Sequence, residues 1–176
     1  RLEALEAKGN GRIHWVDGID EEMPGRFGWK ASSPTVEIQS AAAFAGDMGL
    51  TSTIAPFDDC TDAQTDCIDA IDGGEPEVTD RVLDRVVTYS STIAVPARRR
   101  ADDPTVLKGK GLFHDVGCAD CHTPSHRTGE SVIPELSNQL IWPYTDLLLH
   151  DMGEGLSDNR PSGDAKPSEW KTPPLW

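Results

Sequence analysis

The sequence predicts a mainly α-helical protein with much irregular structure, and three observations support this fold class. Apolar residues recur at helical spacing in two segments, one over 35–48 and one that begins at Thr79. No stretch alternates between apolar and polar residues in the way that a half-buried strand would. The 176 residues include 16 Gly and 13 Pro, so the helices should be short and separated by turns.

The first hundred residues are expected to be largely irregular and poor in helix. Residues 2–7 form a short helix, and a loop rich in glycine and charge follows it. The helix over 35–48 has a loose apolar face that includes Phe44, and Gly49 ends it. Residues 51–76 then form an acidic loop that contains two cysteines.

A stronger helical pattern starts after Thr79, with apolar residues such as Val82 on one side and charged residues on the other. It stops before the basic segment 98–100, where we place a domain boundary. The chain is thus divided into residues 1–100 and residues 101–176. In the second part, Asp103 followed by proline marks the start of a helix that leads to a pair of cysteines.

The charge of the chain limits its partners. The formal net charge is −14 at pH 7, which would be repelled by nucleic acid and by an anionic membrane surface. No stretch approaches the roughly 18 apolar residues of a membrane span. We therefore expect no nucleic-acid partner and no membrane span. A cationic redox partner protein, or simple solubility, fits the acidic charge.

The segment CADCH, with Cys118, Cys121 and His122, is the attachment pattern of c-type heme. Two thiols three residues apart on a turn can form thioethers with the two vinyl groups of the porphyrin. The next residue then offers its imidazole to the iron as the proximal ligand. A buried heme would also supply core that a chain with only 37% hydrophobic residues lacks. The sequence thus predicts a covalent heme c in a cytochrome-c-like domain over 101–176.

Two other uses of these cysteines remain open. Zinc usually takes four ligands, often from two cysteine pairs, and Cys60 and Cys67 are poorly spaced for a second pair. A redox dithiol of the thioredoxin type would lie beside a βαβ pattern, which the sequence lacks. The basic segment 98–100 is interpreted as a solvated linker, with contact to an acidic partner or a heme propionate as the alternative.

The sixth iron position has two candidate ligands, Met152 and His150, in one short segment. A methionine ligand would raise the reduction potential, a second histidine would lower it, and an open position would suit peroxide chemistry. Ordinary core packing is the alternative role for Met152.

The second cysteine pair, Cys60 and Cys67, lies in the acidic loop. Four aspartates surround it, so nothing there favours a thiolate, and a local disulfide is the better interpretation. A disulfide and a c-type heme both indicate an oxidising compartment, so we expect a periplasmic or extracellular location. No signal peptide is visible and the first residue is arginine, which suggests a processed product or a fragment.

Several long motifs resemble those of the bacterial di-heme oxidoreductase family, whose members are described as thiol oxidoreductases or peroxidases. The motifs occur in the family's order and span nearly the whole chain: GRFGWKA (25–31), DMGLT (47–51), VPARR (95–99), CADCH (118–122), PYTDLLLHDMG (143–153) and TPPLW (172–176). The family is similar to the di-heme cytochrome c peroxidases, which have two cytochrome-c-like domains. The resemblance therefore implies that 1–100 is the remainder of a first such domain, that a second heme belongs to a region before this chain, and that sequence continues beyond it.

The resemblance also implies site residues. Trp29 stands where the peroxidases have an electron-relay tryptophan between the hemes, and Gln39 and Asp47 stand near the positions of the glutamine and glutamate that assist peroxide cleavage. Asp47 is shorter than glutamate and lies eight rather than ten residues after Gln39, which departs from the pattern. The peroxidases also hold calcium between domains, so the acidic loop is a candidate calcium site, with a solvated loop as the alternative.

Two functions follow. The first is an extracytoplasmic, peroxidase-like heme oxidoreductase. The second is a non-catalytic electron-transfer cytochrome or a subunit of a multiheme array, with a redox protein or another heme domain as partner.

Overall fold

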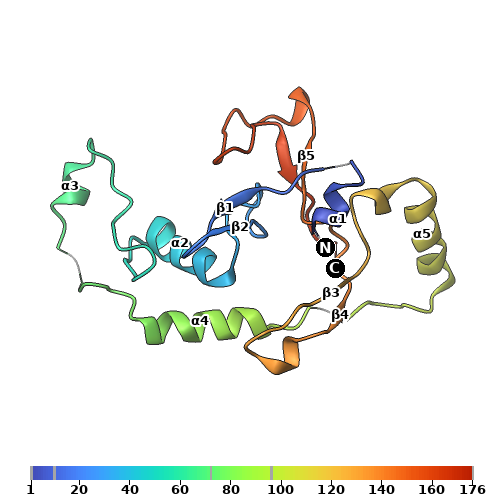
Figure 1. Cartoon of the computed structure of the whole chain (residues 1–176), viewed down its shortest axis with the longest axis horizontal. Helices are drawn as coiled ribbons and strands as arrows, with labels where there is room; N and C mark the ends of the chain where they lie inside the picture. The colour runs from blue at the N-terminus through green and yellow to red at the C-terminus, as the bar shows by residue number, and fades with distance from the viewer. Residues whose placement is uncertain (1, 10, 72, 96, 176) are drawn as a thin grey trace. The chain divides into compact units, whose positions relative to one another are not determined.

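The computed structural model describes residues 2–9, 11–71, 73–95 and 97–175 (Figure 1). Its helices are α1 (Leu2–Glu6), α2 (Val36–Met48), α3 (Thr65–Ile68), α4 (Asp80–Thr92) and α5 (Pro104–Asp115), with single 3₁₀ turns η1 (Cys118–Asp120), η2 (Pro134–Leu136) and η3 (Glu154–Leu156). Its strands are β1 (Trp15–Asp17), β2 (Glu22–Pro24), β3 (His126–Arg127), β4 (Leu140–Ile141), β5 (Leu149–Asp151) and β6 (Glu169–Lys171).

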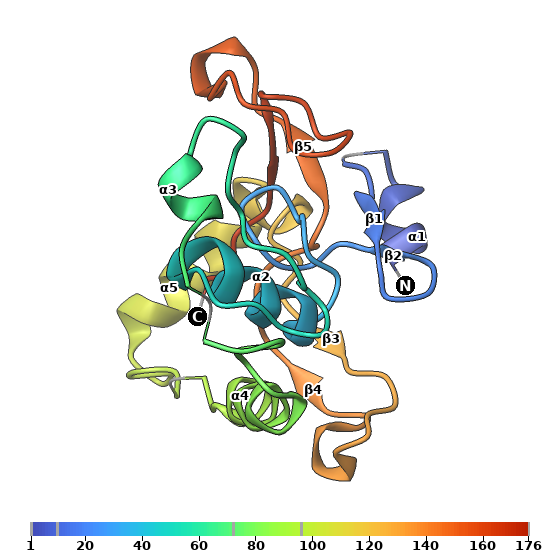
Figure 2. The same ribbon diagram turned by 90° about the vertical axis from the view of Figure 1, so that its left-hand side faces the viewer.

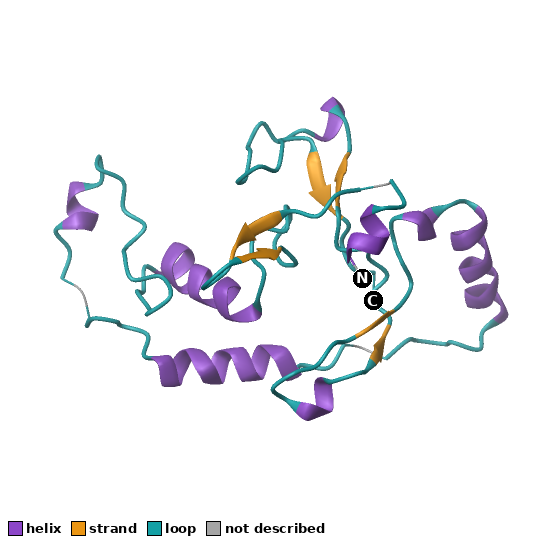
Figure 3. Cartoon of the chain, in the orientation of Figure 1, coloured by secondary structure: helices purple, strands orange, loops and turns teal. Residues whose placement is uncertain are grey.

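The prediction of a mainly α-helical fold was wrong. Helix accounts for 33% of the chain and strand for 13%, and much of the remainder is loop (Figure 3). The strands pair as three separate antiparallel ribbons, β1 with β2, β3 with β4 and β5 with β6. Each strand has only two or three residues, which is too short for an alternating apolar pattern to be visible in the sequence.

The four expected helices nevertheless occur at their expected places. Thr35 caps α2 by accepting a hydrogen bond from the Ile38 N–H at 3.1 Å, and Gly49 ends it with φ at +65°, the left-handed conformation that glycine adopts without strain. Asp103 caps α5 in the same way, through the N–H of Thr105 at 2.8 Å. Cap residues recognisable in the sequence therefore fix both helix starts.

Two compact units are built from interleaved parts of the chain, so the boundary predicted near residue 100 stays a prediction. One unit comprises 15–27 and 33–93, and the other comprises 1–14, 28–32 and 94–176. In the first, α2 and α4 lie side by side, as Figures 1 and 2 both show, around a core of Ala41, Val78 and Leu83.

The other unit has a small apolar core and a large buried polar network. Among the described residues, Ala31, Leu149 and Ala165 form its apolar cluster. Beside them, Lys30 is 6% exposed, and its ammonium group donates to the carbonyl oxygens of three residues in or next to β6, at 3.0 to 3.2 Å. The Lys30 ammonium also lies 4.0 Å from the ring centre of Trp170. Polar contacts therefore replace much of the apolar packing that the composition lacks.

Arg12 connects the start of the chain to β6 in this unit. Its backbone pairs with that of Leu149, and its guanidinium makes two 2.8 Å hydrogen bonds to the carboxylate of Glu169 and further contacts to Asp164. These bonds are the largest cause that lowers the pKa of Glu169 to about 2; burial acts in the opposite direction, and the N–H of Lys166 adds to the lowering.

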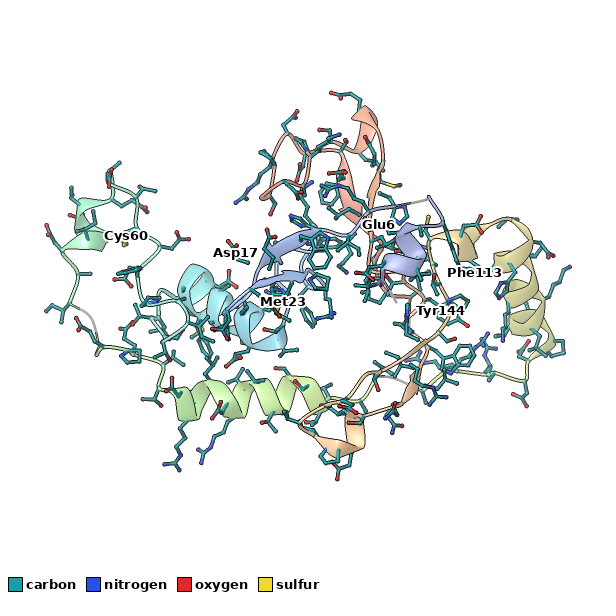
Figure 4. All side chains as sticks on the ribbon, viewed as in Figure 1. Glu6, Asp17, Met23, Cys60, Phe113 and Tyr144 are labelled. Carbon is teal, nitrogen blue, oxygen red and sulfur yellow. A yellow bond between two sulfur atoms is a disulfide. The ribbon has the colours of Figure 1, made fainter. Side chains whose placement is uncertain are left out.

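Among the described residues, no helix is long and apolar enough to cross a membrane. In the acidic loop, the sulfur atoms of Cys60 and Cys67 lie 1.90 Å apart, within bonding distance (Figure 4).

Candidate functional site

The CADCH motif lies directly after α5, on a turn that glycine makes possible. Gly117 has φ at +84°, and the 3₁₀ turn η1 then brings the N–H of His122 to within 3.0 Å of the Cys118 carbonyl oxygen. The Cys118 thiol is exposed, the Cys121 thiol is partly buried, and both are free. The turn thus presents two free thiols followed by an imidazole.

The imidazole of His122 is held in one orientation. Its Nδ1 atom lies 2.8 Å from the carbonyl oxygen of Tyr144, and since a carbonyl only accepts, Nδ1 carries the proton. The ring of Phe113 lies 6.2 Å from the imidazole and 5.6 Å from the Tyr144 ring, with the latter contact edge-to-face; Figure 4 labels both aromatic residues. This arrangement leaves Nε2 as the nitrogen suited to bind a metal.

An open groove of about 1210 Å³ lies on the same unit beside these residues. Its apolar lining comes from α5, from the β4 region and from the end of the chain: Val106, Phe113, Ile141, Trp142, Tyr144 and Leu175. The charged residues that line the groove are Arg98, Arg99 and Lys110. A second cavity beside Ala119 has a volume of only about 120 Å³.

A heme fits this set of residues. The thiols can form thioethers, and the imidazole, held in one orientation, can bind iron. The groove is apolar and large, whereas the cavity beside Ala119 is too small for a heme. Phe113 of α5 lies on the approach to the motif and also lines the groove.

The two candidates for the sixth iron position are placed differently. His150 is 8% exposed; its Nε2 lies 2.8 Å from Asp146 Oδ2 and its Nδ1 lies 3.8 Å from the Cys121 sulfur. Met152 is 51% exposed, and neither residue lines the groove. Because both nitrogens of His150 are engaged, this arrangement does not favour it as a ligand, and the assignment of the sixth ligand stays a prediction.

The predicted catalytic residues belong to different units. Trp29 is 74% exposed, and its carbonyl oxygen accepts a hydrogen bond from the N–H of Lys171 at 2.9 Å. Gln39 and Asp47 lie near opposite ends of α2 in the other unit, with Asp47 exposed. Their common role with Trp29 stays a prediction.

Zinc and redox-dithiol chemistry find little support. Burial, with smaller contributions from Asp146 and Asp120, raises the pKa of Cys121, which disfavours the thiolate that both would need. In the described part of the chain, no three or more His, Cys, Asp or Glu side chains are grouped so that they could hold a metal ion. The described residues of the acidic loop, which was considered for calcium, therefore form no such group either.

Sequence reasoning missed the partners that orient the site. Tyr144 acts through its backbone carbonyl, in a left-handed conformation with φ at +51°, and no side-chain pattern reveals that role. Asp146 and His150 are four residues apart, a spacing that usually signals a helix, but here the segment is a loop that leads into β5.

The chain thus combines a CxxCH turn, a histidine held in one orientation and an adjoining apolar groove, the features of an oxidoreductase module that could hold a heme. The model of the family described as "di-haem oxidoreductase, putative peroxidase" matches residues 17–176, so this chain belongs to that family. This membership, which confirms the resemblance drawn from the motifs, makes the chain part of a family of peroxidase-type oxidoreductases. No curated protein and no solved structure matches significantly.

Proposed function

We propose that this chain carries one covalently attached heme c and serves a peroxidase-like oxidoreductase outside the cytoplasm. The observation that carries the proposal is the 2.8 Å contact between His122 Nδ1 and the Tyr144 carbonyl oxygen, made directly after two free thiols and beside the apolar groove. A histidine that binds a metal commonly donates its other ring nitrogen in this way.

Each residue of the motif has a defined role in the proposal. The thiols of Cys118 and Cys121 would add across the two vinyl groups, with sulfur bonding to one vinyl carbon and hydrogen ending on the other, so that no electrons are exchanged with an outside reagent. His122 would hold the iron through Nε2. When bound, the heme supplies a one-electron carrier.

The family membership supports a catalytic role in peroxide reduction. In this proposal Cys118, Cys121 and His122 would hold a heme that supplies one-electron transfer between a redox partner and a second heme of the whole protein. Trp29 would be the relay, and Gln39 and Asp47 would be proton-transfer groups at the peroxide-binding site. An electron-transfer role without catalysis is the second candidate, favoured by the exposure of Trp29 and Asp47.

An oxidising compartment, the periplasm or the exterior, agrees with the bonding distance between the Cys60 and Cys67 sulfur atoms. The net charge of −14 suits a partner protein with a basic docking surface.

Acid–acetone extraction tests the heme assignment. The chain is expressed with an export signal in a host that matures c-type cytochromes, extracted, and examined by absorption spectroscopy when oxidised and reduced. We expect a heme spectrum that survives extraction, its loss in the double variant Cys118→Ala/Cys121→Ala, and its retention in the control Cys60→Ala/Cys67→Ala. A colourless wild-type protein, or heme fully removed by extraction, would contradict the proposal.

Peroxide turnover separates the two functions. With a reduced electron donor, the peroxidase-like function predicts hydrogen peroxide consumption by the whole di-heme protein, with a lower rate after Trp29→Phe. A heme that remains six-coordinate and inert to peroxide would favour the electron-transfer function.

A further inference from the structure

We propose that Arg98, Arg99 and Lys110 form a binding site for the two heme propionates, at the charged part of the groove. This inference rests on the proposed heme attachment and adds to it the residues that recognise the carboxylate groups. It departs from the interpretation of the basic segment as a solvated linker.

The first argument is charge. The whole chain has a formal net charge of −14, yet the charged side chains that line the groove are these three cations. Among the described lining residues, none is aspartate or glutamate. A local excess of positive charge on a strongly acidic protein indicates an anionic ligand at this place.

The second argument is the combination of surfaces. The remaining lining is apolar and rich in aromatic residues, including Phe113, Trp142 and Tyr144. A ligand that matches both parts has a large flat apolar body and a small number of negative groups. Heme has this form, with two carboxylates on one edge, and arginine binds carboxylates through paired N–H groups.

The third argument is attachment. Phe113 and Tyr144 line the groove and also contact the His122 imidazole, so a group bound to His122 and to the preceding cysteines would be adjacent to this lining. Lys110 lies one helical turn before Phe113 on α5, while the arginines come from the segment that precedes that helix. Two chain segments therefore bring positive charge to one groove.

The chain provides matched controls for a test. Arg100 is adjacent to the arginine pair, does not line the groove, and instead lies 3.7 Å from Asp103. Lys108 is exposed on the same helix as Lys110 and also lies outside the lining. Substitution at either position removes one positive charge without removing a groove contact, and the two substitutions together remove as much charge as the double arginine variant.

The experiment compares the heme-loaded double variant Arg98→Gln/Arg99→Gln with the double control Arg100→Gln/Lys108→Gln, and the variant Lys110→Gln with the single control Lys108→Gln. The midpoint potential is measured by redox titration, and the propionate bending bands by resonance Raman spectroscopy. Positive charge beside the heme favours the reduced state, so both groove variants should have lower potentials than their controls and shifted propionate bands. The variant Arg98→Lys/Arg99→Lys, which keeps the charge, should have a nearly unchanged potential.

Two results would overturn the inference. Potentials and propionate bands that are the same in groove variants and controls would show that the cations do not contact the propionates. The midpoint potential could also fall as far in Arg98→Lys/Arg99→Lys as in Arg98→Gln/Arg99→Gln. That result would show a structural effect of the arginines instead of an effect of their charge. If the wild-type protein had no heme that survives acid–acetone extraction, the proposed function itself would be contradicted. That result is distinguishable from the other two, which require heme-loaded protein.

Discussion

The Nδ1 atom of His122 lies 2.8 Å from the carbonyl oxygen of Tyr144, and this single contact determines which ring nitrogen is available to a metal. It joins the CADCH turn to the loop that leads into β5, across 22 positions of the sequence. The contact uses a backbone oxygen, so side-chain replacement at Tyr144 would not remove it.

The variant His122→Ala should keep its covalent heme but lose the proximal ligand. The thiols remain, so the heme should survive acid–acetone extraction, while the absorption and electron paramagnetic resonance spectra should change in spin state. Added imidazole should restore the original spectrum. The control His114→Ala, at an exposed position of α5, should leave the spectrum as it is. An unchanged spectrum in His122→Ala would contradict the assignment of the ligand.

The helices and the CADCH motif could be predicted from the sequence because their signals are local. A cap such as Thr35 or Asp103 and a terminal glycine act within one helical turn. The strands could not be predicted because each has only two or three residues, even where β1 and β2 form a local hairpin. The β3–β4 and β5–β6 pairs and the Tyr144 contact also depend on residues that are far apart in the sequence. The groove is likewise formed by parts of the chain that only the fold brings together.

Gly117 and Gly111 should respond in opposite ways to replacement by alanine. Gly117 is left-handed, and an added Cβ would lie 3.2 Å from Asp120 Oδ2, so Gly117→Ala should destabilise the fold by about 1–2 kcal/mol and reduce heme attachment. Gly111 lies within α5 with open space around it, so Gly111→Ala should stabilise the fold by about 1 kcal/mol. Urea unfolding followed by circular dichroism measures both. Equal effects in the two variants would show that the left-handed turn is not required.

The N-terminal cap of α5 should contribute measurably to stability. Asp103→Ala removes the side chain that accepts the Thr105 N–H and should lower the free energy of unfolding by about 1 kcal/mol. The neighbouring variant Asp102→Ala removes the same charge from an exposed position and should change it by less than about 0.5 kcal/mol. Thermal unfolding of the two variants compares them directly, and a loss of the same size in both would indicate a charge effect instead of a cap.

The pairing of Glu169 with Arg12 should make the fold sensitive to acid. The hydrogen bonds from Arg12 lower the pKa of Glu169 from 4.5 to about 2 in the folded state, so the folded protein binds this proton less readily than the unfolded chain. The stabilisation is therefore complete above about pH 4.5 and is lost as the pH falls toward 2. We expect it to be about 2 kcal/mol, because Arg12 is partly exposed and solvent weakens the interaction.

Urea unfolding between pH 2 and pH 7 tests this dependence in wild type, Glu169→Gln and Glu154→Gln. Glu169→Gln should lower the free energy of unfolding at pH 7 and weaken its decline between pH 4.5 and 2. Glu154 is exposed on η3, so its variant should follow the wild-type curve. If Glu169→Gln declined with pH as steeply as wild type, other carboxylates would have to account for the acid sensitivity, and the contact that joins the start of the chain to β6 would not be its source.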